Sequence, residues 1–197
     1  MTKEIMVDLD NTLVNFTQML FNHIEDNFGF IFREEQVLKY DFCDLFFRMG
    51  LNKLTVINIF NTLYQDETLY TDKCIKTKYY NQIVKLLRKY KKQGYKITCH
   101  TKVSSEEMKT SKEKYFKKNY RNLFDNIIID LIQGKEIIES TKDHHYDIII
   151  DDSPFVVKNY LNNNPNGIVF LPVTKYNEFL LNDENYSNRI QTLKEDK

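Results

Sequence analysis

Short apolar runs recur along the chain and alternate with stretches of helical period. The runs are rich in Ile and Val, and we expect them to form strands at 5–9, 95–99, 126–131, 146–150 and 167–171. Strands that are apolar throughout, with helices between them, predict a parallel sheet that is covered on both faces.

The clearest helical pattern covers residues 79–90, with apolar side chains along one face and basic side chains opposite. Gly94 follows this pattern and predicts the end of the helix before the next strand. Two further helices are predicted, at 105–119 and 154–162. Because ligands of such sheets bind outside the carboxyl ends of the strands, polar residues at those ends are the candidates for a site.

One long segment interrupts the alternation of strand and helix. Residues 16–75 are mainly helical in pattern and dense in aromatic side chains. The predicted fold class is α/β, with a three-layer, Rossmann-like parallel sheet and a small helical cap inserted after the first strand. We therefore expect a catalytic core formed by 1–15 and 76–197, and a helical cap formed by 16–75.

Composition narrows the possible partners. Among 197 residues, 28 Lys and Arg balance 28 Asp and Glu, so no net charge favours a nucleic-acid polymer or a membrane surface. No apolar run is long enough for a membrane span, and the chain opens without a secretory pattern, so we expect a cytoplasmic protein. Cys43, Cys74 and Cys99 lack metal-site spacing and are expected to be reduced thiols.

The first predicted strand is followed by two acids one residue apart, Asp8 and Asp10. If the chain curls after Asp8, a carboxylate and a nearby carbonyl can converge on a cation. Burying two acids beside an apolar strand is costly without a metal or a cationic partner, which predicts a site. The alternative is a simple turn or helix cap formed by Asp, Asn and Thr.

A second acidic pair, Asp151 and Asp152, follows three consecutive isoleucines. Carboxylates that approach Asp8 and Asp10 would raise one another's pKa unless a divalent cation neutralised them. Mg²⁺ prefers one or two carboxylates together with water and substrate phosphate. We therefore predict a Mg²⁺ site formed by these four acids, and a capping role ahead of the Pro154 helix is compatible with it.

The run from Asp8 to Thr12 resembles the first motif, DxDxT, of the haloacid dehalogenase-like phosphohydrolases. The resemblance implies that Asp8 attacks phosphorus to form an aspartyl-phosphate, and that Asp10 is the general acid and base. It also implies that a hydroxyl at the second strand end binds phosphate, for which Thr101 is preferred and Thr98 is the competitor.

Within this superfamily, the chain resembles the 5′(3′)-deoxyribonucleotidases. Their third and fourth motifs are matched by Lys135-Glu136-Ile137-Ile138 and by Asp147 to Pro154. The match implies that Lys135 binds phosphate, with Lys142 as the alternative. Two further phosphate ligands are implied, Lys102 after Thr101 and Lys114 in a Glu-Lys-Tyr run.

The same resemblance implies a substrate pocket lined by cap aromatics. Phe16 matches the position of a ring that stacks on a base, and three others fall nearby in the cap, Phe46, Phe47 and Phe60. The alternative is that most of these rings form the core of the cap.

The predicted function is a Mg²⁺-dependent phosphomonoesterase of 5′-nucleotidase type that acts on nucleoside monophosphates. The alternatives are a phosphatase for another small phosphorylated metabolite and a catalytically silent binding protein. The expected partner is a small molecule, with neither a nucleic-acid polymer nor a membrane, and a homodimer is left open.

Overall fold

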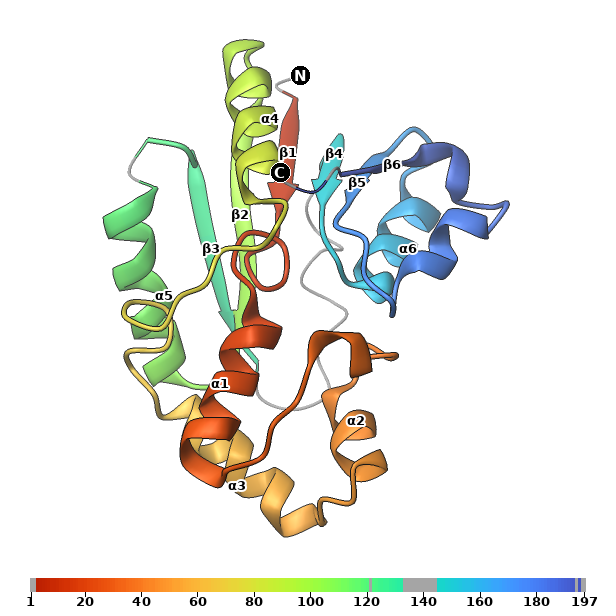
Figure 1. Cartoon of the computed structure of the whole chain (residues 1–197). Coiled ribbons are helices and arrows are strands. Elements are labelled where there is room, and N and C mark those ends of the chain that lie inside the picture. The colour runs from red at the N-terminus through yellow and green to blue at the C-terminus, as the bar shows by residue number, and fades with distance from the viewer. Residues whose placement is uncertain (1–2, 121, 133–144, 194, 196–197) are drawn as a thin grey trace.

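The chain folds around a parallel sheet of six strands in the order β3-β2-β1-β4-β5-β6 (Figure 1). A computed structural model describes residues 3–120, 122–132, 145–193 and 195. The strands are β1 Glu4–Val7, β2 Lys96–Val103, β3 Asn126–Leu131, β4 Ile148–Ile150, β5 Ile168–Leu171 and β6 Ile190–Thr192.

Six α-helices connect the described strands or extend beyond them. They are α1 Phe16–Phe28, α2 Phe42–Arg48, α3 Lys53–Tyr64, α4 Tyr80–Lys92, α5 Glu106–Asn119 and α6 Pro154–Asn163. Three short 3₁₀ helices complete the described elements, η1 Glu34–Gln36, η2 Glu178–Asn182 and η3 Ser187–Arg189.

The two faces of the sheet are buried against different helices. Successive side chains of a strand point to opposite faces, so Ile5 and Val7 share one face and Met6 takes the other. Ile5 and Val7 belong to the core that contains the buried residues of α4 and α5. Met6 belongs to the core formed with α6. The result is a three-layer arrangement, which confirms the predicted fold class.

Helices α1, α2 and α3 lie between β1 and β2 in sequence and beyond the carboxyl ends of the strands in space (Figure 1). Each begins at a polar residue whose side chain accepts a backbone hydrogen bond, and these residues are Asn15, Asp41 and Asn52. We call residues 16–75 the cap, as predicted from the sequence. The division of the chain at these bounds stays a prediction.

The strands predicted from apolar runs are all present, with two differences. Strand β2 continues to Val103, so Thr101 lies within the strand and not after it. Strand β6 was not predicted, because only Ile190 among its three residues is strongly apolar. In the described part of the chain, no helix is long and apolar enough to cross a membrane.

Candidate active site

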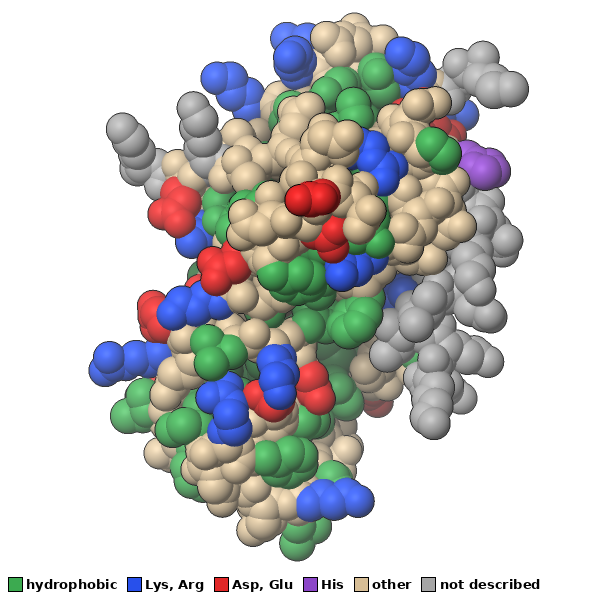
Figure 2. All heavy atoms as spheres, turned by 90° about the vertical axis from the view of Figure 1, so that its right-hand side faces the viewer, with side chains coloured by type: hydrophobic (Ala, Val, Ile, Leu, Met, Phe, Trp, Pro, Cys, Tyr) green, Lys and Arg blue, Asp and Glu red, His purple; other side chains and the backbone are tan. Residues whose placement is uncertain are grey.

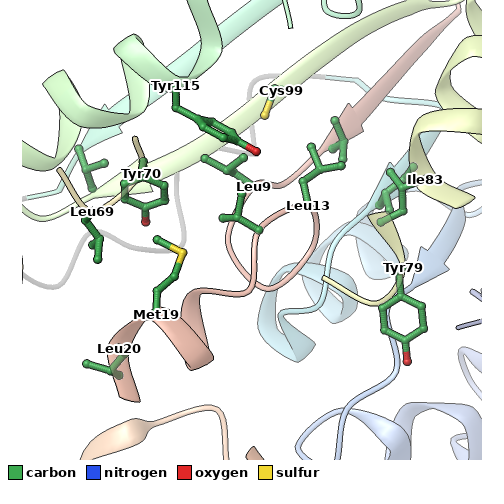
Figure 3. Close-up of a cluster of buried hydrophobic side chains, with 14 of the residues drawn as sticks. Leu9, Leu13, Met19, Leu20, Leu69, Tyr70, Tyr79, Ile83, Cys99 and Tyr115 are labelled. Atoms are coloured by element: carbon green, nitrogen blue, oxygen red, sulfur yellow. The ribbon is translucent and has the colours of Figure 1, made fainter. Parts of the chain in front are cut away.

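The chain coils tightly after Asp8. As a result, Leu9 and Leu13 point into the apolar core, whereas Asp8 and Asp10 belong to the acidic site. The carbonyl of Leu9 accepts hydrogen bonds from Leu13 N at 2.8 Å and Val14 N at 2.9 Å. Asn11 adopts a positive φ of 55°, a conformation that Asn tolerates better than most residues. Leu9 and Leu13 thereby enter the apolar cluster drawn in Figure 3. The conditional expectation that the chain curls here is confirmed.

Lys112, on α5, is the cation at the centre of the site. Its side chain is fully buried, and its ammonium donates to Asp10 Oδ2 at 2.7 Å and to Thr101 Oγ1 at 2.7 Å. A third bond of 2.8 Å goes to the carbonyl of Lys102. All three donors of the ammonium are therefore used. Because the Thr101 oxygen accepts from Lys112, the Thr101 proton points to some other acceptor.

Asp10 is held by a second donor from a distant part of the chain. The hydroxyl of Tyr70 donates to Asp10 Oδ1 at 2.7 Å, and Tyr70 is fully buried. Burial, and next the charge of Asp10, raise the pKa of Tyr70 well above its usual value, so the phenol stays neutral. Both oxygens of Asp10 are thus occupied by protein donors.

The two acids after β4 differ in how far the protein already satisfies them. Asp152 Oδ1 accepts from the Thr12 hydroxyl at 3.2 Å, and Oδ2 accepts from the Tyr176 hydroxyl. Asn177 Nδ2 donates to the Asp152 carbonyl at 2.8 Å and fixes the backbone. Asp151 Oδ1 accepts from Ser153 N at 2.8 Å. Asp151 thus has more capacity left for a ligand than Asp152.

Burial and mutual repulsion disfavour the ionised forms of three of these acids. Burial, and then the charges of Asp151, Asp10 and Asp152, raise the pKa of Asp8 well above its usual value, and Lys112 opposes the shift. Burial and the neighbouring Asp152 likewise raise the pKa of Asp151, opposed by Ser153 N–H and the charge of Lys102. Burial raises the pKa of Asp152 to about 7, against the hydrogen bonds from Tyr176 and Thr12.

Among these acids, Asp8 and Asp151 are the ones that could hold a divalent cation, because both carboxylate oxygens of Asp10 and of Asp152 already accept hydrogen bonds. Lys112 acts on Asp8 and Lys102 acts on Asp151, but burial and the neighbouring acids still disfavour the ionised forms of both carboxyls. No group of three or more His, Cys, Asp or Glu side chains in the described residues is arranged to hold a metal by itself.

The predicted phosphate-binding residues divide into three groups. Thr101 and Lys102 lie at the site, through the contacts just described. Lys114 does not join them, since its ammonium is exposed and lies 3.4 Å from Glu67 Oε2. Lys135 and its alternative Lys142 fall outside the described residues. The roles assigned to all of them stay predictions.

The predicted pocket aromatics pack largely within the cap. Phe46 has no exposed surface and lies 6.0 Å from Phe60, ring centre to ring centre. Phe16 is partly buried and meets Phe42 edge-on at 6.3 Å. Phe47 is half exposed. The structure accounts for Phe46 and Phe60 as cap core, the alternative raised from the sequence, and a substrate role for Phe16 stays a prediction.

The sequence analysis did not identify Lys112, Tyr70, Tyr176 or Asn177 as residues of this site. Lys112 was detectable, because the buried residues of α5 recur at Met108, Ser111, Lys112, Tyr115 and Phe116. A lysine on the apolar face of a helix is costly to bury without a partner, and that is a signal of a site. Tyr70 and Tyr176 carried no comparable signal in the sequence.

A separate cavity of about 500 Å³ opens beside the loop after β1. It is lined by residues of that loop, of η1, of the segment 76–79 and of the loop 173–176. None of the four carboxylates lines this cavity.

The fold is similar to that of several solved structures that are described as haloacid dehalogenase-like hydrolases. One solved structure of that class, a haloacid dehalogenase-like family hydrolase from Streptococcus pneumoniae, matches with a TM-score of 0.61 and 16% identity. The match covers 98% of this chain and 94% of that one. A scan against protein-family models finds no match for this chain, nor does a search of curated proteins.

CbbY from Rhodobacter sphaeroides, solved in complex with phosphate, matches similarly. Its TM-score is 0.61 at 13% identity, with 99% of this chain and 95% of that chain covered. A CbbY variant bound to xylulose-1,5-bisphosphate matches with a TM-score of 0.59 at 11% identity, with 97% and 94% covered. Identities this low establish a common fold and leave the activity of this chain to its own residues.

Proposed function

We propose that this protein is a Mg²⁺-dependent phosphomonoesterase that acts through an aspartyl-phosphate on Asp8. The observation that carries the proposal is the set of groups gathered around Asp8. A second acid, Asp10, follows it on the same turn, and the Lys112–Thr101 pair lies against that acid. The acidic pair after β4 acts on Asp8 from the neighbouring strand.

Four residues of the site have a chemical task in this proposal. A carboxylate oxygen of Asp8 forms a bond to phosphorus as the bond from phosphorus to the leaving oxygen breaks. Asp10 gives a proton to that leaving oxygen and then takes one from the water that cleaves the aspartyl-phosphate. The positive charge of Lys112 and a hydrogen bond donated by the Thr101 hydroxyl stabilise the charge on the phosphoryl oxygens.

Residues that would hold the metal are Asp8 and Asp151, with Asp152 positioned beside them. Asp152 is a poorer direct ligand, because Thr12 and Tyr176 already donate to both of its oxygens. When bound, Mg²⁺ would offset the negative charge that the nucleophile and the phosphate bring together. The excess of carboxylates over lysines at the site supports this requirement.

For the substrate, we propose a nucleoside monophosphate, following the resemblance of the acidic strand end and its lysine motif to the deoxyribonucleotidases. The second candidate is a sugar phosphate, since CbbY, a structure with the same fold, was solved with xylulose-1,5-bisphosphate. The two candidates share the phosphate end of the site and differ in the leaving group. A nucleoside and a sugar would therefore need different contacts from the cap and from the neighbouring part of the core.

Phosphate release tests the proposal directly. The purified protein with Mg²⁺ would be assayed on p-nitrophenyl phosphate, dUMP, dTMP and a panel of sugar phosphates. We expect turnover, with dUMP or dTMP preferred, and we expect Asp8→Asn to abolish turnover while leaving the unfolding transition intact. Substantial activity in Asp8→Asn would refute the nucleophile assignment. A wild-type protein inactive on every compound would favour a silent binding protein.

A further inference from the structure

A tyrosine of the cap reaches the acidic end of the core. Tyr40 lies just before α2, and its side chain hydrogen-bonds with that of Ser153. Ser153 is the residue whose backbone N–H holds Asp151. The ring of Tyr40 also packs against Tyr176, whose hydroxyl donates to Asp152, so Tyr40 lies beside the acidic pair.

The ring of Tyr40 meets two aromatic rings of the core. It lies 5.6 Å from Tyr176, the residue that donates to Asp152, and 5.8 Å from Phe155, both in edge-to-face geometry. Tyr176 is buried, whereas Tyr40 is 41% exposed and Phe155 is 63% exposed. Because these two rings are exposed where the cap meets the core, they retain apolar surface that a ligand can contact.

Phe155 stands beside the carboxylates because of its place at the start of α6. It is the second residue of that helix and follows Ser153 and Pro154. Figure 2 views the side of the molecule with α6, and hydrophobic side chains lie there between the upper part of the molecule and the cap below. Two exposed rings, one from the cap and one from the core, thus flank the acidic strand end.

We propose that Tyr40 and Phe155 form a platform that binds a flat, aromatic leaving group of the substrate. The proposal rests on the proposed phosphatase function, and it concerns which phosphate esters the site prefers. A phosphoryl group beside Asp8 leaves its ester group to extend past the neighbouring carboxylates, where these rings are exposed. Stacking on an aromatic ring favours a nucleobase or an aryl group over a saturated polyol.

The opposing possibility is that the two rings only close the cap onto the core. A closing contact would affect all leaving groups alike, whereas a platform discriminates between them. The ratio of kcat/KM for a planar leaving group to that for a saturated one therefore separates the two roles.

The experiment compares dUMP and p-nitrophenyl phosphate with glycerol 3-phosphate, using wild type, Phe155→Ala and Tyr40→Leu. We expect KM for the two aromatic esters to rise about tenfold in each variant, with little change for glycerol phosphate. Tyr40→Phe keeps the ring and should retain the preference. Phe179→Ala removes another exposed core aromatic, 46% exposed and packed on Lys158, and serves as the matched control.

Equal loss on all three esters, or no change, would overturn the platform. If the wild type hydrolysed none of them, the proposed function would fall, and calorimetric binding of the same esters would decide the present inference. Tighter binding of dUMP than of glycerol phosphate, lost in Phe155→Ala and kept in Phe179→Ala, would support the platform. Equal affinities, or binding of neither ester, would reject it.

Discussion

The hydroxyl of Tyr70 donates a 2.7 Å hydrogen bond to Asp10 Oδ1, from the segment that returns the chain from α3 to α4. Lys112 holds the other oxygen at the same distance. An acid–base Asp10 must exchange one of these donors for the leaving group or for water. Because Tyr70 is neutral and Lys112 is charged, the bond to Tyr70 is the weaker of the two and the easier to exchange.

Tyr70→Phe should therefore lower kcat by about tenfold and change KM less than twofold. One hydrogen bond to a charged group is worth about 1.5–3 kcal/mol, and only the orientation of Asp10 depends on it here. Steady-state kinetics on the preferred substrate would measure the split between kcat and KM. Tyr79→Phe is the matched control, since its hydroxyl donates to the Val173 carbonyl. An unchanged kcat in Tyr70→Phe would show that Asp10 is oriented without it.

Two neighbouring lysines of α5 make a matched pair of variants. Lys112→Met should cost about 3 kcal/mol of unfolding free energy, because it leaves Asp10 and the buried acids without their cation. Lys114→Met should change stability by less than about 0.5 kcal/mol, because that side chain is exposed. Urea unfolding of both variants would measure the difference.

The same pair tests which lysine serves the phosphate. Lys112→Met should reduce kcat/KM by about 100-fold or more, and Lys114→Met by less than twofold. The sequence resemblance assigned phosphate binding to Lys114, so a large effect at Lys114 and a small one at Lys112 would favour that assignment over the geometry.

The strand ends of this site were predictable because they obey local rules. Apolar runs identify β1 and β4, and the acids that follow them must lie at the carboxyl edge of a parallel sheet. Lys112 was predictable in principle, from a lysine on the buried stripe of α5. The phosphate role of Lys114 is implied by its Glu-Lys-Tyr run and stays a prediction, and its exposed side chain lies near Glu67.

Other contacts had no local signature. Tyr70 lies 60 residues from Asp10, and Tyr176 lies 24 residues from Asp152, so neither partner shares an element with its acid. A tyrosine near an aromatic-rich segment is most simply a core residue, and both are indeed buried. Only tertiary packing brings their hydroxyls close enough to donate hydrogen bonds to the carboxylates.

Removal of the buried charge at Asp151 should stabilise the metal-free protein and abolish its response to Mg²⁺. Burial and Asp152 disfavour the ionised form of Asp151, and Asn keeps the oxygen that accepts from Ser153 N. We expect a higher Tm for Asp151→Asn than for wild type in EDTA, and no further rise with millimolar Mg²⁺. Wild type should rise with Mg²⁺ by mass action.

The control is Asp183→Asn, an acid near Lys158 on the core surface, which should keep the wild-type response. Scanning calorimetry with and without Mg²⁺ would measure both effects. A Mg²⁺ response in Asp151→Asn equal to that of wild type would rule out Asp151 as the ligand.

His23 should make the stability of the protein depend on pH below neutrality. It is buried between α1 and α3, with Nε2 2.9 Å from Thr62 Oγ1. Burial, and then the charge of Lys73, lower its pKa below the ordinary value of 6.5. Since the unfolded chain binds the proton more readily, stability is full above about pH 6.5 and is lost as the pH falls toward the lowered pKa.

His23→Gln removes this titration and keeps a donor for Thr62, whose own proton is shared with backbone carbonyls of α3. The loss of unfolding free energy between pH 7.5 and pH 5.5 should therefore be smaller in the variant than in wild type, even if the variant is less stable at both values. His145 is exposed, so His145→Gln should leave the wild-type difference unchanged. Urea unfolding at the two pH values would measure the loss of unfolding free energy in each protein. Equal losses in wild type and His23→Gln would assign the acid sensitivity to other groups.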